Sequence, residues 1–466
     1  MSSFIKLRDV ERSIPFTITA ACLIGFETLG QRQANGVFQV PIQSTLGYGR
    51  TVFSLSIAIV LLLMGLLAPL CSIIIEKYGR PGVLFVTASV CYLTGTLIFS
   101  LAYEINNPGL WVAGISIFTG IGLAGTGFPV MLGEVGRLFP GNDPRALSRR
   151  ALLFGIVPSI AQTGQFVFAP IARSLNASLG WSVTARIFFY QSIIIFPLAF
   201  VLRRKAGATS AAATQQRQVA ESSVEEKKPV PDNNGDTVKT VVRVPEPPTV
   251  GLAIREALGF SPFLLISSAY FVCGWHVGFV GAHISPYLQD QGLSADIAAW
   301  SLSAIGLGSA VGTFLAGFLP SRIKWLNTKW LLAYIYFMRG ALLLLFLLIP
   351  INATFTMIFS TLFGIHWLST VPPTTSLLAK YLGTKWLGTI SGMAFAAHQV
   401  GSFLGVYLGA LEYDTTKSYA ICWWISFGLA LFAGTCVTFS HQTSLREKIS
   451  SEETYAKLAE NSEQDA

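Results

Sequence analysis

The sequence predicts an all-α membrane protein with twelve transmembrane helices in two six-helix halves. Three observations support this prediction. The 466 residues are 52% hydrophobic and only 12% charged, whereas soluble domains carry about 25% charged residues. Twelve apolar segments are long enough to cross a bilayer, which takes about 20 residues. A polar insert from residue 204 to residue 249 divides these segments into six and six.

The domain organisation follows from these segments. We expect a cytoplasmic N-terminus over 1–13, a first half over 14–203, a disordered linker over 204–250, a second half over 251–440 and a cytoplasmic tail over 441–466. The linker is rich in Ala, Gln, Glu, Lys and Pro, so it buries too little apolar surface to fold. Residues 251–260 are expected to form an amphipathic helix on the inner membrane surface. The predicted spans are 14–40, 51–76, 82–103, 109–135, 151–173, 181–203, 262–288, 295–319, 330–349, 353–379, 387–411 and 418–440.

The charges of the short loops predict the orientation. Lys and Arg gather in the loops after the second, fourth, eighth and tenth spans, and the other loops contain few of them. Basic loops face the cytoplasm, so both termini are expected there. The plasma membrane is the expected host because no retention signal is evident. The net charge of +8 has this explanation, and no basic patch indicates nucleic acid. Two sequons, at Asn176 and Asn352, fall on the outer side as candidate glycosylation sites.

The first span is unusually polar. Glu27, Gln31, Arg32, Gln33 and Asn35 lie within it. A charge near the middle of a bilayer costs about 2.5–3.5 kcal/mol, so such residues usually face a wet cavity. Arg32, Gln33 and Asn35 are therefore candidate solute-binding residues. Two interpretations of Arg32 stay open: contact with a solute anion, or an ion pair with Glu27 or Glu134.

The two halves contain weak parallel repeats. Pro41 and Gly47 after the first span match Pro286 and Gly292 after the seventh, with one constant offset. Gly155 and Gln162 of the fifth span match Gly392 and Gln399 of the eleventh with another offset. Repeated halves joined by a polar loop are typical of alternating-access carriers. Helix breaks are expected at Pro129 in the fourth span and at Pro372 and Pro373 in the tenth.

Histidines are concentrated in the second half. His276 and His283 share one face of the seventh span, and His398 lies in the eleventh beside Gln399. No histidine pair has metal-ligand spacing, so neither a metal nor a cofactor is expected. The histidines and Gln399 are candidates for anion binding or proton relay, with packing as the alternative. Arg339 in the ninth span is expected to be structural.

One loop resembles a known family. Residues 71–84, CSIIIEKYGRPGVL, resemble the signature loop of the major facilitator superfamily, with Ser72 and Glu76 in place of its Gly and Asp. The resemblance implies that Glu76 and Arg80 hold an inner gate between the halves. A second copy, GFLPSRI at 317–323, keeps Arg322 without an acid. Arg137, near the inner end of the fourth span, is a further gate candidate.

Within that superfamily the sequence is similar to the monocarboxylate transporter and oxalate–formate antiporter branch. The segments that carry the likeness include GQRQANGVF at 30–38, FGIHWLSTVPPTTSLLAKYLG at 363–383 and GMAFAAHQVGSFLGVYLGALEYD at 392–414. The resemblance implies a small carboxylate substrate, moved by symport with a proton or in exchange for another anion. We expect the protein to function as a monomer. The eighth span departs from the animal carriers because it has no charge within 301–318.

Two other functions stay open. The uncharged eighth span and the many aromatic residues suit an efflux carrier for a secondary metabolite or drug. A transporter-like sensor is the second alternative. The sequence has neither a phosphate-binding P-loop nor a hydrolase nucleophile elbow. We therefore expect neither an ATP-driven pump nor an enzyme.

Overall fold

The structure is a computed structural model that describes residues 14–78, 81–105, 107–137, 144–202, 247, 249–323, 325–440, 443 and 445. Within these residues, ten helices are long and apolar enough to cross a bilayer. The first and tenth spans are the remaining two: the first is polar, and the tenth is divided into shorter helices. The predicted all-α fold of twelve spans is confirmed.

The first half consists of six spans, three of which are broken into shorter helices. The elements are α2 (Ile14–Gln33), η1 (Asn35–Phe38), α3 (Gln39–Leu46), α4 (Arg50–Tyr78), α5 (Pro81–Ser100), α6 (Ala102–Ile105), α7 (Pro108–Thr126), α8 (Phe128–Arg137), α9 (Pro144–Leu179), α10 (Trp181–Ser192) and α11 (Ile195–Val201).

The second half has one short helix before its six spans. The elements are α13 (Val250–Leu258), α14 (Ser261–Asp290), α15 (Ala295–Arg322), α16 (Thr328–Leu348), α17 (Ala353–Ile365), α18 (Val371–Leu382), α19 (Leu387–Thr416) and α20 (Ala420–Phe439).

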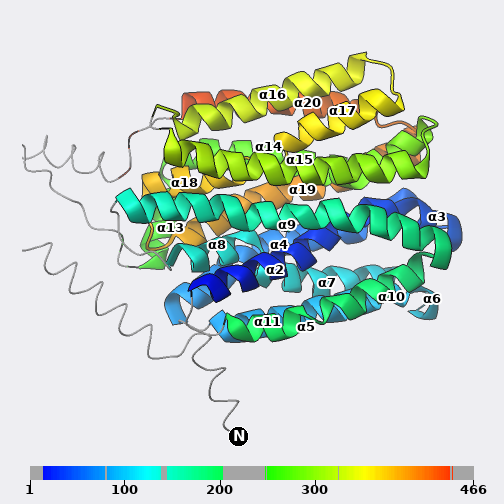
Figure 1. Cartoon of the computed structure of the whole chain (residues 1–466), viewed down its shortest axis with the longest axis horizontal. Helices are drawn as coiled ribbons and strands as arrows, with labels where there is room; N and C mark the ends of the chain where they lie inside the picture. Colours follow the sequence, from blue (N-terminus) through cyan, green and yellow to red (C-terminus); the bar gives the residue numbers. More distant parts are fainter. Residues whose placement is uncertain are drawn as a thin grey trace, which may run out of the picture.

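The two halves lie on each other along the long axis of the bundle (Figure 1). The second half forms the upper layers of this view and the first half the lower layers. Helix α4 packs against α19, and α9 packs against α15, and among the described residues these two pairs make the most extensive contact between the halves. We call the right-hand end of this view the α3 end and the left-hand end the α13 end. The loop charges predict that the α13 end is cytoplasmic.

Breaks interrupt several spans near their middle. The prediction of one continuous helix for the first span is wrong: α2 ends at Gln33, and a 3₁₀ turn follows before α3. Gly127 separates α7 from α8, and Pro129 lies in the first turn of α8. Residues 366–370 separate α17 from α18, where Pro372 and Pro373 occupy the first turn. Such breaks release backbone carbonyl and amide groups in the interior of the bundle.

The ends of the matching first and seventh spans support the repeat. Gly47 ends α3 at φ 69°, and Gly292 follows α14 at φ 84°. Positive φ is the left-handed region that glycine adopts at no steric cost, so both glycines end a helix in the same way. The offset found in the sequence therefore joins two structurally similar positions.

The polar linker falls largely outside the described residues, as do both termini. Its boundaries, its disorder and the cytoplasmic position of the tail stay predictions. The chain becomes described again at α13, which Thr249 caps by accepting a hydrogen bond from the amide of Leu252. Ala253 and Ala257 of α13 are buried, and the helix packs on α14 and α19.

Candidate functional site

Arg32 lies where the first span breaks. It occupies the last turn of α2, and the 3₁₀ turn begins three residues later at Asn35. Both Arg32 and Asn35 line two cavities, one of about 60 Å³ and one of about 20 Å³. The break therefore places a guanidinium and an amide at the junction of two spaces inside the bundle.

The larger space, which we call the side cavity, lies entirely within the first half. Helices α2, α4, α5, α7 and α10 contribute to its walls, and most of the side chains that line it are aromatic or aliphatic. Phe38 and Phe99 pack edge to face with ring centroids 5.5 Å apart. The residues that line it are Gln31, Arg32, Asn35, Phe38, Phe53, Ser56, Ile57, Val60, Tyr92, Gly95, Thr96, Phe99, Ile115, Thr119, Ala185 and Phe188.

The smaller space, which we call the central cavity, lies between the halves. Gln33 and Gln165 come from the first half, and Val277 and Trp367 come from the second. The Gln33 amide donates to Gln162 Oε1 at 2.8 Å, and Trp367 Nε1 donates to Gln33 Oε1 at 3.2 Å. Gln33 thus joins the fifth span of one half to the broken tenth span of the other.

The guanidinium of Arg32 makes no hydrogen bond or ion pair with the part of the chain that the structure describes, and its Nε is buried. Glu27 does not pair with it, because the Glu27 carboxylate accepts hydrogen bonds from the amides of Gln31 and Gln191. The structural ion pair with Glu27 or Glu134 is therefore not formed in this conformation. A cation inside the bundle without a direct ion-pair partner attracts an anion.

The histidines lie within the second half. His276 Nε2 is 2.8 Å from the carbonyl of Ser426 in α20, and His283 Nε2 is 2.9 Å from the carbonyl of Val406 in α19. His398 Nδ1 lies 2.9 Å from Gln399 Oε1, and the Gln399 amide contacts Met64 Sδ across the halves at 3.0 Å. None of these four polar residues lines either cavity beside Arg32. Their proposed solute contact stays a prediction for another conformation of the carrier.

Arg339 stabilises the break in the tenth span. Its Nε donates to the carbonyl of His366 at 2.7 Å, and a terminal nitrogen donates to the carbonyl of Trp367. A continuous helix would use these carbonyls for its own hydrogen bonds. Arg339 is fully buried, so it replaces backbone partners that the break removes. The Trp367 ring is thereby held beside Gln33 and the central cavity.

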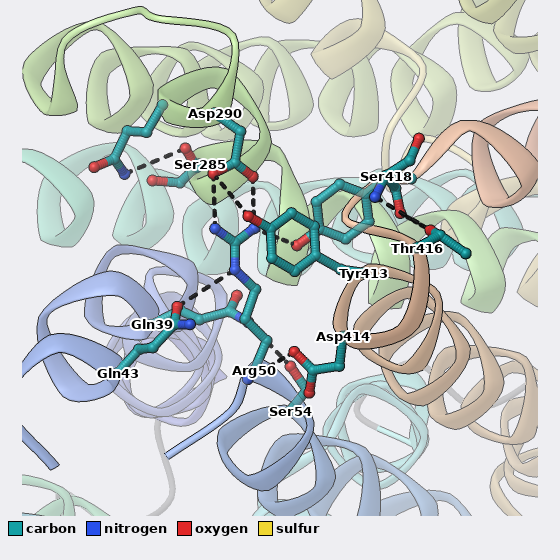
Figure 2. Close-up of polar contacts among 12 residues, drawn as sticks. Gln39, Gln43, Arg50, Ser54, Ser285, Asp290, Tyr413, Asp414, Thr416 and Ser418 are labelled. Carbon is teal, nitrogen blue, oxygen red and sulfur yellow. Dashed lines mark hydrogen bonds and ion pairs between the residues drawn. The ribbon is translucent and has the colours of Figure 1, made fainter. Parts of the chain in front are cut away.

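At the α3 end, Arg50 of α4 binds the second half (Figure 2). Its guanidinium makes two hydrogen bonds to the Asp290 carboxylate, at 2.7 and 2.8 Å, and donates to the Tyr419 hydroxyl at 2.7 Å. The ring of Tyr413 lies 3.6 Å from the Arg50 guanidinium carbon. Because Arg50 and Tyr419 are both buried, water weakens these contacts less than it would at an open surface. We call this group the Arg50 latch.

The helices α4 and α19 also cap each other across the halves. Asp414, near the end of α19, accepts hydrogen bonds from the first amides of α4, at Arg50 and Thr51. Glu76, near the end of α4, accepts hydrogen bonds from the early amides of α19, at Gly388 and Thr389. Carboxylates at helix N-termini satisfy free amides and the helix dipole. Each of the two helices is therefore capped at its N-terminus by a carboxylate near the C-terminus of the other.

The other candidate gate and modification residues have simpler surroundings. Arg80 and the side chain of Arg137 lie outside the described residues, and Arg322 is exposed, with its guanidinium 5.5 Å from the Phe318 ring. Asn352 is exposed and caps α17 by accepting from the amide of Phe355. Asn176 lies in the last turn of α9. These gate and glycosylation assignments stay predictions.

Sequence reasoning missed the Arg50 latch and Trp367. The sequence identified Arg50 only as one of the few basic residues on the outer side. The opposite charges of Arg50 and Asp290, both at the outer ends of spans, could have indicated an ion pair. No group of three or more His, Cys, Asp or Glu side chains suited to a metal ion occurs where the chain is described.

The chain is similar in sequence and in fold to known membrane transporters. The family model described as Major Facilitator Superfamily matches residues 20–406. The uncharacterized MFS-type transporter YcxA of Bacillus subtilis is 31% identical over 156 residues, which cover 32% of this chain and 37% of that relative. Monocarboxylate transporter 12-B of Danio rerio is 24% identical over 76% of this chain and 70% of its own length. The crystal structure of the E. coli fucose:proton symporter FucP matches with a TM-score of 0.60 and 16% identity, over 92% of this chain and 99% of that chain. This last likeness shows the fold alone.

Proposed function

The chain belongs to the major facilitator superfamily, and we propose that it is a secondary transporter of a small organic anion whose carboxylate binds Arg32. The observation that carries this proposal is the Arg32 guanidinium, which has no partner among the described residues and lies at the junction of the side cavity and the central cavity. A guanidinium presents a planar fork of donors that matches a carboxylate. An arriving anion would supply the ion-pair partner that no described residue supplies.

The surroundings of Arg32 favour an anion with an apolar part. Asn35 borders both cavities, so its amide is available for a second polar contact with the carboxylate. The side cavity beyond it is lined by phenylalanines and aliphatic side chains. Its volume of about 60 Å³ is well below the roughly 150 Å³ that holds a benzene ring. A monocarboxylate with a short aliphatic chain fits this description better than an aromatic acid.

Closure at both ends supports transport by alternating access. The Arg50 latch joins α4 to the second half at the α3 end, and the Glu76 cap joins α4 to α19 at the other end of the same helix pair. A carrier must open one end at a time, so one set of contacts would break while the other remains. The monocarboxylate transporters among the relatives agree with the proposed substrate class.

Uptake into proteoliposomes tests the proposal. Labelled lactate, pyruvate, oxalate and a longer dicarboxylate are offered to the purified protein, with an anion already trapped inside for exchange. We expect Arg32→Ala to reduce carboxylate transport about 10- to 100-fold, because a hydrogen bond to a charged group contributes roughly 1.5–3 kcal/mol. Arg32→Lys should retain part of the activity, since the charge remains and the fork of donors is lost.

Two results would reject this proposal. Undiminished carboxylate transport by the Arg32→Ala variant would exclude Arg32 as the anion-binding group. Expulsion of a hydrophobic compound, with no carboxylate moved by the wild type, would favour the efflux alternative. A variant at the exposed pair between Arg186 and Glu104, Arg186→Ala, removes an arginine that lines neither cavity and should transport normally.

Filling the side cavity should change the preference for chain length. Ala185 is buried in α10 and lines this cavity, so Ala185→Leu would occupy part of the space. We expect transport of five-carbon acids to fall about tenfold while acetate and oxalate are affected less, because overpacking costs roughly 1–3 kcal/mol only for substrates that need the space. Competition of unlabelled acids of two to six carbons against labelled substrate measures the effect. An equal loss for all chain lengths would contradict a role for this cavity in selectivity.

A further inference from the structure

Glu27 is a buried carboxyl group held by amides. It lies in α2, 7% exposed, and accepts hydrogen bonds from Gln31 Nε2 at 3.1 Å and from Gln191 Nε2 at 3.2 Å. No lysine or arginine in the described part of the chain forms an ion pair with it. Amide partners suit both forms of a carboxyl group, since the NH₂ donates to the anion and the amide oxygen accepts from the acid. The site therefore tolerates binding and release of a proton.

Hydrogen bonds connect Glu27 to the wall of the side cavity. Gln31, which holds Glu27 with its NH₂ group, accepts with its oxygen from the Tyr92 hydroxyl at 3.2 Å and the Ser192 hydroxyl at 3.1 Å. Gln31 and Tyr92 line the side cavity together with Arg32. Gln31 therefore joins the Glu27 carboxyl group to the wall of the cavity that Arg32 also lines.

We infer that Glu27 is the proton-binding group that couples anion transport to the proton gradient, an inference that rests on the function proposed above. The charges support it. Without solute, the charges of ionised Glu27 and Arg32 sum to zero, and a bound monocarboxylate would leave one net negative charge in this part of the first half. One proton, taken by the Glu27 carboxylate from water on one side and returned to water on the other, restores neutrality. A buried net charge is costly. Binding of the anion therefore raises the affinity of Glu27 for a proton, and binding of the proton raises the affinity for the anion.

The other ionisable groups near Glu27 do not replace it. The Tyr92 hydroxyl of α5 interacts with the charges of both Glu27 and Arg32, and it is a far weaker acid than a carboxyl group. Helices α7, α8, α9, α10 and α11 also pack on α2. Their remaining charged side chains that the structure describes lie nearer the two ends of the bundle: Glu134 in the last turn of α8, Arg149 and Arg150 in the second turn of α9, Arg173 in the last turns of α9, and Arg186 of α10, which pairs with Glu104.

Glu27→Gln separates coupling from transport. The amide keeps the shape and hydrogen bonds of a permanently protonated carboxyl group. In proteoliposomes with an acidic exterior, the wild type should accumulate a monocarboxylate up to about tenfold per pH unit, and the variant should show no accumulation above equilibrium. Anion exchange at equal pH on both sides should persist in the variant within about threefold. Glu27→Asp should recover part of the accumulation, because it restores a titratable group.

The outcomes distinguish this inference from the function it rests on. Accumulation by Glu27→Gln at the wild-type level would overturn the assignment of Glu27 and leave the anion carrier intact. Loss of accumulation in His398→Gln with Glu27→Gln unaffected would likewise overturn it and assign the proton to the second half. Absence of any carboxylate exchange in the wild type would overturn the proposed function, and the inference with it. Glu104→Gln, at an exposed carboxylate, is the matched control and should accumulate normally. If Glu27→Gln fails to fold, Glu27→Asp decides: an unchanged pH dependence of accumulation would overturn the assignment, and a shifted one would support it.

Discussion

Replacing Arg50 with alanine should open the α3 end of the bundle. Arg50 is 4% exposed and binds Asp290 and Tyr419 of the second half, so alanine removes three hydrogen bonds across the interface. Removing one partner of a buried ion pair costs about 3–5 kcal/mol. The Asp290 side chain is 29% exposed, so we expect a smaller effect of roughly 1.5–3 kcal/mol. That is a shift of about 10- to 100-fold toward the open conformation.

Distances between spin labels measure this opening at both ends. Labels on Ser44 and Thr415 report on the α3 end, and labels on Lys77 and Lys385 report on the α13 end; all four positions are exposed. Arg50→Ala should lengthen the first distance and leave the second short. Glu76→Gln is the opposite control, because it weakens the cap on α19 and should lengthen only the second distance.

Exchange of the two charges provides a rescue. Arg50→Asp together with Asp290→Arg restores an ion pair in reversed order and should shorten the distance at the α3 end again. If Arg50 affected only the stability of its own helix, the double variant would not restore the short distance at the α3 end. If neither single variant changes either distance, the contacts do not control opening.

The fold was predictable because its signals are local. Runs of apolar residues determine the spans, loop charges predict the orientation, and proline marks the start of α8 and α18. The break after α2 was missed because no proline marks it, and the polarity of Arg32 and Asn35 indicates a cavity rather than a helix end. Breaks that polar side chains and tertiary contacts stabilise leave no such mark in the sequence.

The candidate site was predictable only in part. Arg32 was identified because a permanent charge inside an apolar run is exceptional. The Arg50 latch was missed because its partners are 240 and 369 positions away in the chain, so no spacing rule joins them. The spacing of seven residues between His276 and His283 predicts a shared helix face. It does not tell which neighbour that face meets, and in this conformation both rings contact backbone carbonyls.

Replacing Arg339 with leucine should destabilise the second half more than loss of the Arg50 latch would. The guanidinium is fully buried and donates to the carbonyls of His366 and Trp367 at the break between α17 and α18. Leucine would leave both carbonyls without this donor, at roughly 1–3 kcal/mol each, or about 2–6 kcal/mol in total. We expect a large loss of monodisperse protein in detergent and a melting temperature lower by several degrees, measured by size exclusion after heating.

The conservative variant tests whether Arg339 also positions the solute site. Arg339→Lys keeps the charge, but its single ammonium cannot reproduce the fork that reaches two carbonyls. It should fold with reduced stability and displace Trp367, whose ring donates to Gln33 at the central cavity. A purely structural arginine would lower stability without changing the apparent affinity for the anion. A positioning arginine would also raise KM severalfold, and Gln33→Ala would then raise KM similarly with normal stability. Equal KM values for wild type, Arg339→Lys and Gln33→Ala would show that the contact between Trp367 and Gln33 makes no difference to anion binding. Arg339 would then contribute to stability alone.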